Sequence, residues 1–296
     1  MPLFRREGSG DRQQIQQEAA LQERSRQAID AGGLPMRAQE RIAAIRAGGD
    51  APVFTSDLSV DEFLLARQSG YEALGLVNGS SVYHIGWTGW TYTGELEAQT
   101  RALGGAANSA IDRLRQEAAG MGAIGVIGVR LQITKPGWGE SLVEVIAIGT
   151  AIRVRGAPPP PEPFLSGLSG QEFWTLLKTG SRPVGLVFGN SAHYVHTNWQ
   201  DRRRAFSWYN QEMPQYTQSL YQAQRGAFGR MHGQAAQHQA HGIVGLHIEH
   251  SLRRIPMRQN DVEYEDYVVE YISWGTAILE APHAGGVAAP AMIREL

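Results

Sequence analysis

Cysteine is absent from this sequence of 296 residues. Without thiols the chain can form no disulfide, no thiolate nucleophile and no cysteine-ligated zinc or iron–sulfur site. Any metal ion would therefore need histidine or carboxylate ligands. Zinc, nickel and copper are the divalent ions that histidine sites suit.

Net charge is nearly absent as well. The 27 Lys and Arg side chains oppose 29 Asp and Glu side chains, which leaves a formal net charge of -2. A chain so balanced has no general field that would attract a phosphate backbone or an anionic membrane. We therefore expect no nucleic-acid partner.

Long hydrophobic runs are also lacking. The most apolar run, Ala123–Val129, is far shorter than the roughly 20 residues that a membrane-spanning helix needs. The first residues, Met1–Glu7, carry arginines with no apolar stretch after them, unlike a secretory signal peptide. We expect a cytoplasmic protein with no membrane insertion.

The chain does contain an internal repeat, because short blocks of the first half recur in the second half at spacings of 110, then 117, then 126 residues. The matched blocks are Leu58-Ser59 with Leu168-Ser169, Gly75-Leu76-Val77 with Gly185-Leu186-Val187, Val126-Ile127-Gly128-Val129 with Ile243-Val244-Gly245-Leu246, and Gly149-Thr150-Ala151-Ile152 with Gly275-Thr276-Ala277-Ile278. Blocks that keep their order in this way are typical of two diverged copies of one domain. The growing spacing predicts loop insertions in the second copy.

The repeat predicts the domain organisation. We place copy one at residues 51–156 and copy two at residues 166–280, joined by a stiff proline-rich linker at 157–165. Residues 1–50 form a helical or partly disordered arm, because helix formers are frequent there and large apolar side chains are few. The arm is either a weakly packed tail or a helix that docks on the assembly or on a protein partner. The tail at 281–296, rich in Ala, Gly and Pro, is predicted to be disordered.

Each copy has the same order of predicted elements. Helices are predicted at Pro35–Ala47 in the arm, at Val60–Gln68 and Ala107–Met121 in copy one, and at Gln171–Lys178 and Tyr216–Gln239 in copy two. Strands are predicted at Ala73–Val77, Gly125–Thr134 and Leu142–Val154, and again at Val184–Phe188, Ile243–Leu252 and Tyr264–Leu279. A small antiparallel sheet packed on one long helix is an α+β fold.

The repeated blocks resemble the YbjQ-like (UPF0145) domain, which is often described as heavy-metal-binding. Its pattern is a Gly-x-Val-x-Gly strand, a long helix ending in Gly-Ala, a Val-Val-Gly-Val strand and a last strand ending Gly-Thr-Ala-Val. Copy one matches it at Gly75–Gly79, Met121–Arg130 and Ile148–Ile152, and copy two at Gly185–Gly189, His241–Leu246 and Trp274–Ile278. The resemblance covers about three quarters of the chain.

The resemblance also implies self-assembly, because single domains of this family look like pentamer-forming units in which extra short strands complete a ring. Two copies per chain would give either stacked rings or one ring of mixed copies, and the sequence does not choose between them. Exposed sheet edges on a small domain are commonly hidden by assembly. We expect a homo-oligomeric ring, a pentamer or a multiple of one.

Histidines are concentrated in copy two, where eight of the nine follow residue 190. On a continuing helix His238 and His241 would share one face, with His232 near it, and His247 on the next strand could complete a divalent-metal site. Alternatively these histidines are solvated, or hydrogen-bonded at a subunit contact, where they could sense pH.

Tryptophans follow the first strand of each copy. Trp87 and Trp90 in copy one mirror Trp199 and Trp208 in copy two. Such side chains either stack on a ligand or anchor a subunit interface.

No catalytic motif is recognisable, and Glu95, Glu97 and Glu144 are scattered carboxylates that we interpret as surface charge. We therefore predict a non-enzymatic oligomeric scaffold, or a protein that binds a small ligand or partner. The first alternative is a histidine-based divalent-metal-binding or metal-responsive protein. The second is an enzyme with a pocket between subunits.

Overall fold

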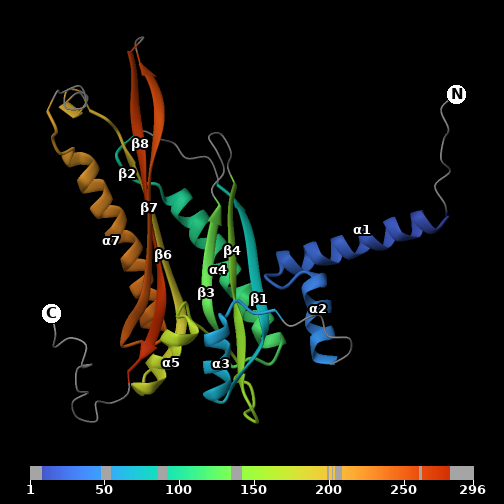
Figure 1. The fold of residues 1–296 in the computed structure, drawn as a ribbon. Helices are drawn as coiled ribbons and strands as arrows, with labels where there is room; N and C mark the ends of the chain where they lie inside the picture. The colour runs from blue at the N-terminus through green and yellow to red at the C-terminus, as the bar shows by residue number, and fades with distance from the viewer. Residues whose placement is uncertain are drawn as a thin grey trace.

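Two four-stranded sheets, one for each copy, lie side by side in the computed structural model (Figure 1). The structure describes residues 9–47, 55–85, 92–134, 142–198, 200–201, 203, 209–259 and 262–280. The elements are α1 (Ser9–Asp30), α2 (Met36–Ala47), α3 (Val60–Gln68), β1 (Tyr71–His84), β2 (Gly94–Glu95), α4 (Glu97–Gly120), β3 (Gly125–Thr134), β4 (Leu142–Val154), β5 (Phe164–Leu165), α5 (Gly170–Lys178), β6 (Arg182–Val195), α7 (Pro214–Gln237), β7 (Gly242–Gln259) and β8 (Val262–Leu279). The predicted α+β class is confirmed.

The short helices α3 and α5 begin with the same capping box. Ser59 accepts a hydrogen bond from the Glu62 amide, and the Glu62 side chain accepts one from the Ser59 amide. Ser169 and Glu172 repeat this arrangement in copy two. Each box satisfies backbone donors that the first helical turn leaves unpaired, which fixes where both helices begin.

The long helix of copy one begins at Glu97, ten residues before the predicted Ala107. Gly104 and Gly105 lower the helical propensity there, but packing outweighs that cost. A Cβ on Gly105 would lie 2.9 Å from the Tyr83 ring, and one on Gly104 would lie 3.1 Å from the Asn190 side chain. The two glycines therefore let α4 approach β1 and the second copy closely.

The two copies exchange short strands. The first sheet has the order β1-β4-β3-β5, and the second has the order β2-β6-β8-β7. Strand β2 leaves copy one and pairs antiparallel with β6, while β5 precedes copy two and pairs parallel with β3. Neither strand was predicted, since two residues are too few to show a hydrophobic period. Phe164–Leu165, at the end of the predicted linker, thus form a strand that holds the copies together.

The main hydrophobic core spans both copies. Helix α4 contacts β1 and β4 of its own sheet and β6 of the other. Its buried Leu103 belongs to the same cluster as Leu186, Phe188, Ile272 and Trp274 of copy two. Copy two therefore covers the side of α4 that faces away from its own sheet.

The arm forms two helices, and α2 packs on the C-terminal half of α4 (Figure 1). Ile42 is buried there, and a Cβ on Gly120 would lie 3.0 Å from its side chain. The Arg41 guanidinium forms an ion pair with buried Glu117 at 2.5 Å. None of the helices in the described part of the chain combines the length and the apolar character needed to cross a bilayer.

Candidate functional site

The contact between the two copies begins at the edge of β6. The Leu96 amide donates to the Ala192 carbonyl at 2.7 Å, and the Ala192 amide donates to Thr100 Oγ1 at 3.0 Å. The Asn190 side-chain amide also donates to the Thr100 carbonyl at 2.9 Å. Copy one therefore satisfies an edge that β6 would otherwise expose.

A charged group closes this edge. Glu95 Oε1 accepts hydrogen bonds from Ser191 Oγ at 2.9 Å and from Arg230 Nη2 at 2.6 Å. Arg230 also donates to the Asn190 carbonyl at 3.3 Å. We call Glu95, Ser191 and Arg230 the Glu95 clasp. Because its carboxylate comes from copy one and its donors from copy two, the clasp fixes the register between them.

His193 lies opposite Glu95 across the β2–β6 pair and is buried. Its Nδ1 has no hydrogen-bond partner among the described residues. Burial lowers the pKa of His193; the Glu95 charge opposes this shift and the Arg230 charge adds to it. The neutral imidazole is therefore the form that the copy contact favours.

The other end of the contact uses β5. The Ser166 amide donates to the Val126 carbonyl at 2.9 Å, and the Val129 amide donates to the Ser166 carbonyl at 2.9 Å. Glu62 also reaches across and accepts from the Gly170 amide at 2.9 Å. Partial burial alone would raise the pKa of Glu62, but hydrogen bonds from Ser59 and the Gly170 amide outweigh it and lower the pKa.

A cavity of about 300 Å³ lies at this end, between the copies. Polar and charged side chains from both copies line it, among them Asp57, Arg130, Glu172 and His247. Arg130 is held by an ion pair with Asp57. The cavity is a polar junction between the two copies.

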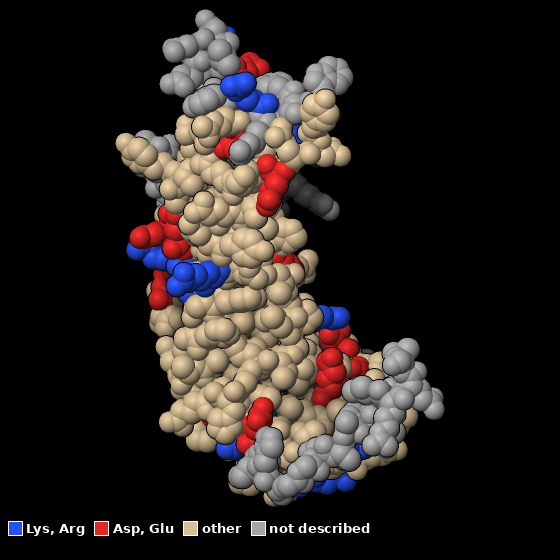
Figure 2. All heavy atoms as spheres, turned by 90° about the vertical axis from the view of Figure 1, so that its left-hand side faces the viewer, with Lys and Arg blue, Asp and Glu red and all other residues tan. Residues whose placement is uncertain are grey.

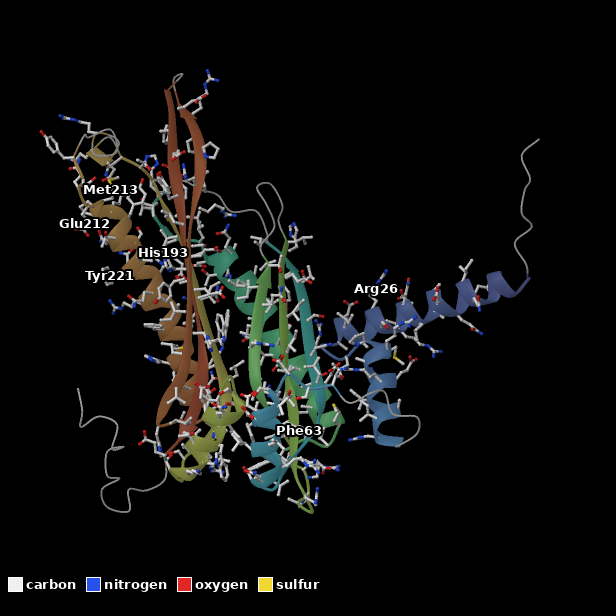
Figure 3. All side chains as sticks on the ribbon, in the orientation of Figure 1. Arg26, Phe63, His193, Glu212, Met213 and Tyr221 are labelled. Atoms are coloured by element: carbon white, nitrogen blue, oxygen red, sulfur yellow. The ribbon has the colours of Figure 1, made fainter. Side chains whose placement is uncertain are left out.

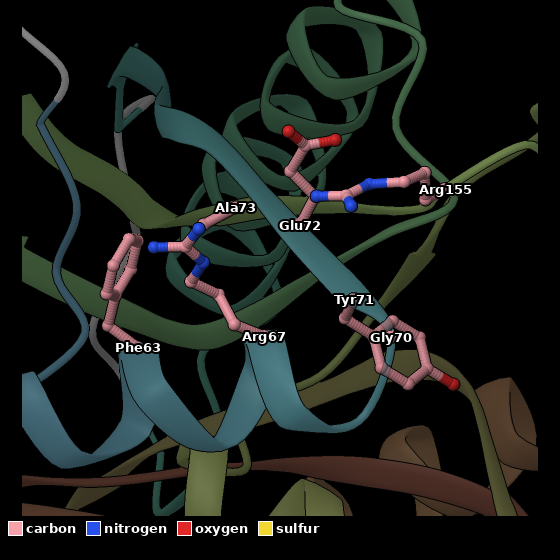
Figure 4. Close-up of a pocket in the computed structure, with 7 residues that line it drawn as sticks. All are labelled: Phe63, Arg67, Gly70, Tyr71, Glu72, Ala73 and Arg155. Atoms are coloured by element: carbon pink, nitrogen blue, oxygen red, sulfur yellow. The ribbon is translucent and has the colours of Figure 1, made fainter.

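A second cavity, of about 360 Å³, lies at the end of α3 in copy one (Figure 4). The Arg67 guanidinium stands 5.7 Å from the centre of the Phe63 ring, and Arg155 lines the same cavity. Burial raises the pKa of Tyr71 there. The residues described around this cavity include no pair of groups placed for acid–base catalysis.

The predicted metal-site histidines do not share a helix. Helix α7 ends at Gln237, His238 follows as its C-cap, and Gln239 takes a φ of 54°. The chain therefore turns before His241, and the expected helical spacing of His238 and His241 was wrong. Its physical cause is the left-handed residue, which ends a helix.

The four histidines lie against different groups, and His238 lies against Gly185, where a Cβ would be 2.9 Å from its Nε2. His232 packs on Phe228 with ring centres 6.3 Å apart, and His247 stacks on Trp274 at 5.3 Å. His241 Nδ1 accepts a hydrogen bond from the backbone amide of Glu280 at 3.2 Å. The described residues contain no group of three His, Asp or Glu side chains that could hold a metal ion. The metal site stays a prediction, as does any role of Trp87, Trp90, Trp199 and Trp208, which lie outside the described residues.

Three apolar positions that are buried in the shared core in copy one recur in copy two, where they are exposed. Leu103 is 4% exposed and its counterpart Leu220 is 36% exposed. Val129 and Leu131 are 1% and 7% exposed, whereas their counterparts Leu246 and Ile248 are 45% and 47% exposed. All three pairs are 117 residues apart in the sequence. Figure 2, which views the α7 side of the molecule, shows that most of this face carries no charged side chain.

Sequence reasoning missed the Glu95 clasp, because Glu95 was interpreted as surface charge. The internal repeat held the missing signal. At the spacing of 117 residues, Glu95 aligns with Glu212, and Arg113 aligns with Arg230. A charge that recurs at the same place in both copies is a candidate for a contact between copies.

Comparison with known proteins links both copies to described relatives. A family model named YbjQ_1, "Putative heavy-metal-binding", matches residues 71–155. The encapsulin nanocompartment protein Rv1762c of Mycobacterium tuberculosis is 36% identical over 244 residues, which cover 80% of this chain and 90% of that protein. A UPF0145 protein of Halorubrum lacusprofundi is 36% identical over 99 residues, covering 31% of this chain and 92% of the relative. A UPF0145 protein of Helicobacter hepaticus is 37% identical over 91 residues, covering 28% and 86%. No solved structure matches the chain.

Proposed function

We propose that this chain, which belongs to the YbjQ-like (UPF0145) family, is a non-enzymatic scaffold that assembles head to tail with copies of itself. Head to tail means that copy two of one chain packs on copy one of the next as the two copies pack within a chain. The exposed apolar face of copy two, defined by Leu220, Leu246 and Ile248, supports this most strongly. The corresponding positions in copy one are buried in the core that both copies share.

Copy one offers the face that would cover these side chains. Val82 and Leu142 are at least half exposed, although their counterparts Ala192 and Val268 in copy two are buried against copy one or in their own sheet. The open face of copy one and the open face of copy two are different surfaces. Contacts between two different surfaces form rings when the rotation closes. A ring of five chains, or a multiple of five, follows from the family resemblance and is part of the proposal.

The apolar face alone is too small to drive assembly. Full burial of a Leu or Ile side chain contributes about 1.5–3 kcal/mol, so covering three half-exposed ones supplies on the order of 3 kcal/mol. Association costs about 4 kcal/mol or more in lost translational and rotational freedom. Strand pairing and charged contacts must therefore add to the apolar contact, as they do within the chain.

The name of the Mycobacterium tuberculosis relative suggests what the scaffold works with. That protein is called an encapsulin nanocompartment protein and aligns with 80% of this chain. We propose that the assembled scaffold works with an encapsulin shell. Co-expression with the encapsulin shell protein of the same organism tests this, since the scaffold should co-sediment with assembled shells and not with the unassembled shell protein.

Native mass spectrometry of the purified chain, before and after chelation, tests self-assembly. We expect a defined homo-oligomer whose mass does not change with chelator. A monomer at all concentrations would overturn the scaffold. A metal ion bound by each chain, removed by chelator and lost when His238 and His241 become Ala, would instead support the histidine-based alternative.

A further inference from the structure

The two copies correspond residue by residue where they meet. Helices α4 and α7 both have 24 residues and both follow an N-cap residue without a side-chain cap. Strands β1 and β6 both have 14 residues and both shift register at the same point, between Ala73 and Gly75 and between Pro183 and Gly185. Positions on the helices therefore match at a spacing of 117 residues, and positions on these strands match at 110.

This correspondence shows that every member of the Glu95 clasp occurs twice. Glu95 corresponds to Glu212 before α7, Arg230 to Arg113 on α4, and Ser191 to Ser81 on β1. The first member of each pair is used within the chain. The second members take no part in the contact within the chain. They are Glu212 on copy two and Arg113 with Ser81 on copy one.

Arg113 is held by the same kind of backbone hydrogen bond as Arg230 in the Glu95 clasp. Its Nη1 donates to the Ser80 carbonyl at 2.6 Å, as Arg230 Nη1 donates to the Asn190 carbonyl. Its Nε is buried without a hydrogen-bond partner among the described residues. Arg113 has no carboxylate partner in the described part of the chain. Its guanidinium can therefore donate hydrogen bonds to a carboxylate of another chain.

Glu212 is the exposed carboxylate that matches it. Among the described residues its side chain contacts the Thr217 hydroxyl, at 2.9 Å, and no cation. Figure 3 shows Glu212 at the start of α7 and Tyr221 further along it, both on the outer side of the helix. Leu220, one residue of the exposed apolar face, directly precedes Tyr221 on this helix.

We propose that Glu212 of one chain binds Arg113 and Ser81 of the next chain, and that Gln211–Glu212 add as a short antiparallel strand to the open edge of β1. This inference rests on the proposed head-to-tail assembly and names its contact. Strand β1 is the outer strand of its sheet, and Tyr83 and His84 take the positions that His193 and Tyr194 take opposite β2. The contact continues the interface that the chain already contains.

Side-chain size fits the same pairing. Within the chain, Gly104 lies against the larger Asn190. At the corresponding places of the proposed contact, the large and exposed Tyr221 of one chain meets the small Ser80 of the next. The contact within the chain pairs a small helix residue with a larger strand residue. The proposed contact between chains pairs a large helix residue with a small strand residue. The exchange favours copy two against copy one over other arrangements.

The far end of the contact differs between the two interfaces. Glu62 caps its own helix and also accepts from the Gly170 amide of the other copy. Its counterpart Glu172 caps only its own helix among the described residues. In the head-to-tail assembly Val60 of the next chain would stand where Gly170 stands. A Cβ on Gly170 would lie 2.8 Å from the Glu62 Cβ, so the Val60 side chain would keep Glu172 from repeating this hydrogen bond in the same geometry.

Charge reversal tests the inference. We expect Glu212→Arg and Arg113→Glu each to raise the dissociation constant of the assembly by about tenfold or more, since each places like charges in contact. Glu97→Arg is the matched control, because Glu97 is an exposed carboxylate on the first turn of α4 that pairs with Arg101 on the same helix. It should leave assembly unchanged. Analytical ultracentrifugation over a concentration series measures the constants.

Mixing the two variants distinguishes a specific contact from misfolding. The double variant should assemble alone, because every contact then joins opposite charges. An equal mixture of Glu212→Arg and Arg113→Glu chains should assemble more strongly than either variant alone, because contacts between unlike chains join opposite or native charges, although a closed ring of five keeps at least one contact between like chains. If Arg113→Glu fails to fold by circular dichroism, Arg113→Gln replaces it and should weaken assembly without rescue. Wild-type assembly that neither single variant weakens would overturn this contact and leave the scaffold proposal standing. A wild-type monomer would overturn both.

Discussion

Copy one and copy two carry apolar residues at corresponding positions but have different neighbours there. Leu103 and Leu220 are the same residue type at the same helical position, yet copy two of the chain covers only the first. A repeat that ends an array normally carries a polar outer face. Copy two keeps leucine and isoleucine there instead. The difference in exposure therefore comes from a missing neighbour and not from a change of residue type.

The largest expected effect breaks the packing that the two copies share. A Cβ on Gly189 would lie 2.0 Å from the Ala227 carbonyl, as one on Gly79 would from the Ala110 carbonyl. Backbone on both sides cannot move away, so Gly189→Ala should cost about 3 kcal/mol or more of unfolding free energy. Denaturant titration measures it.

Gly229→Ala is the matched control on the same helix. A Cβ on Gly229 meets nothing within 4 Å, so alanine should stabilise α7 by about 0.5–1 kcal/mol through helix propensity. Equal effects at Gly189 and Gly229 would show that the close approach of α7 to β6 is not tight.

The second prediction separates the two apolar faces. Leu131→Ala should lower the unfolding free energy by about 2–3 kcal/mol, because Leu131 is buried in the shared core. Ile248→Ala, at the corresponding half-exposed position, should lower the stability of the isolated chain by only about 1 kcal/mol, because only half of its side chain is buried there. It should also weaken assembly. Denaturant titration at low and high protein concentration checks both, and a large loss in the isolated chain from Ile248→Ala would contradict the equivalence of the faces.

The sequence predicted the repeat, the α+β class and several elements to the residue, including α3, β3 and β4. Periodicity and capping signals are local, and Ser59 with Glu62 shows how a local signal fixes a helix start. The exchanged strands β2 and β5 were not predicted, because two residues form a strand only when another copy supplies the sheet edge.

The Glu95 clasp was not predicted for a similar reason. Glu95 and Arg230 are 135 residues apart and meet only after both copies have folded. The expected helical spacing of His238 and His241 failed at Gln239, whose left-handed backbone ends α7 although its sequence context favours helix. Composition indicates which residues could act, while tertiary packing decides which of them meet.

The third prediction concerns the arm, which copy one has and copy two lacks. Arg41 pairs with Glu117, a buried carboxylate, whereas copy two has the neutral Gln234 at that position. Arg41→Ala leaves the buried charge without its cation and should cost about 1–2 kcal/mol, discounted because Arg41 is partly exposed. Thermal unfolding measures the loss.

Arg37→Ala provides the control in the same helix. Arg37 is largely exposed and lies 3.9 Å from Glu18, so its removal should not change the unfolding temperature. If Arg41→Ala also leaves the unfolding temperature unchanged, or if removing residues 1–50 does so, α2 does not stabilise copy one. The arm is then a weakly packed tail.

The smallest effect is a pH dependence confined to the contact within the chain. Burial holds the pKa of His193 below its ordinary value of 6.5 in the folded state. The unfolded chain then binds more protons below pH 6.5, so stability should fall as the pH drops through 6.5 toward the folded pKa. His193→Gln should flatten this fall, while His232→Gln on the exposed face of α7 should not. Copy one has Tyr83 at the corresponding position, so the contact between chains should lack this acid sensitivity. Unfolding temperature and assembly measured between pH 5 and 7 separate the two, and assembly that weakens with acid before the chain itself loses stability would contradict the assignment of His193 to the inner contact alone.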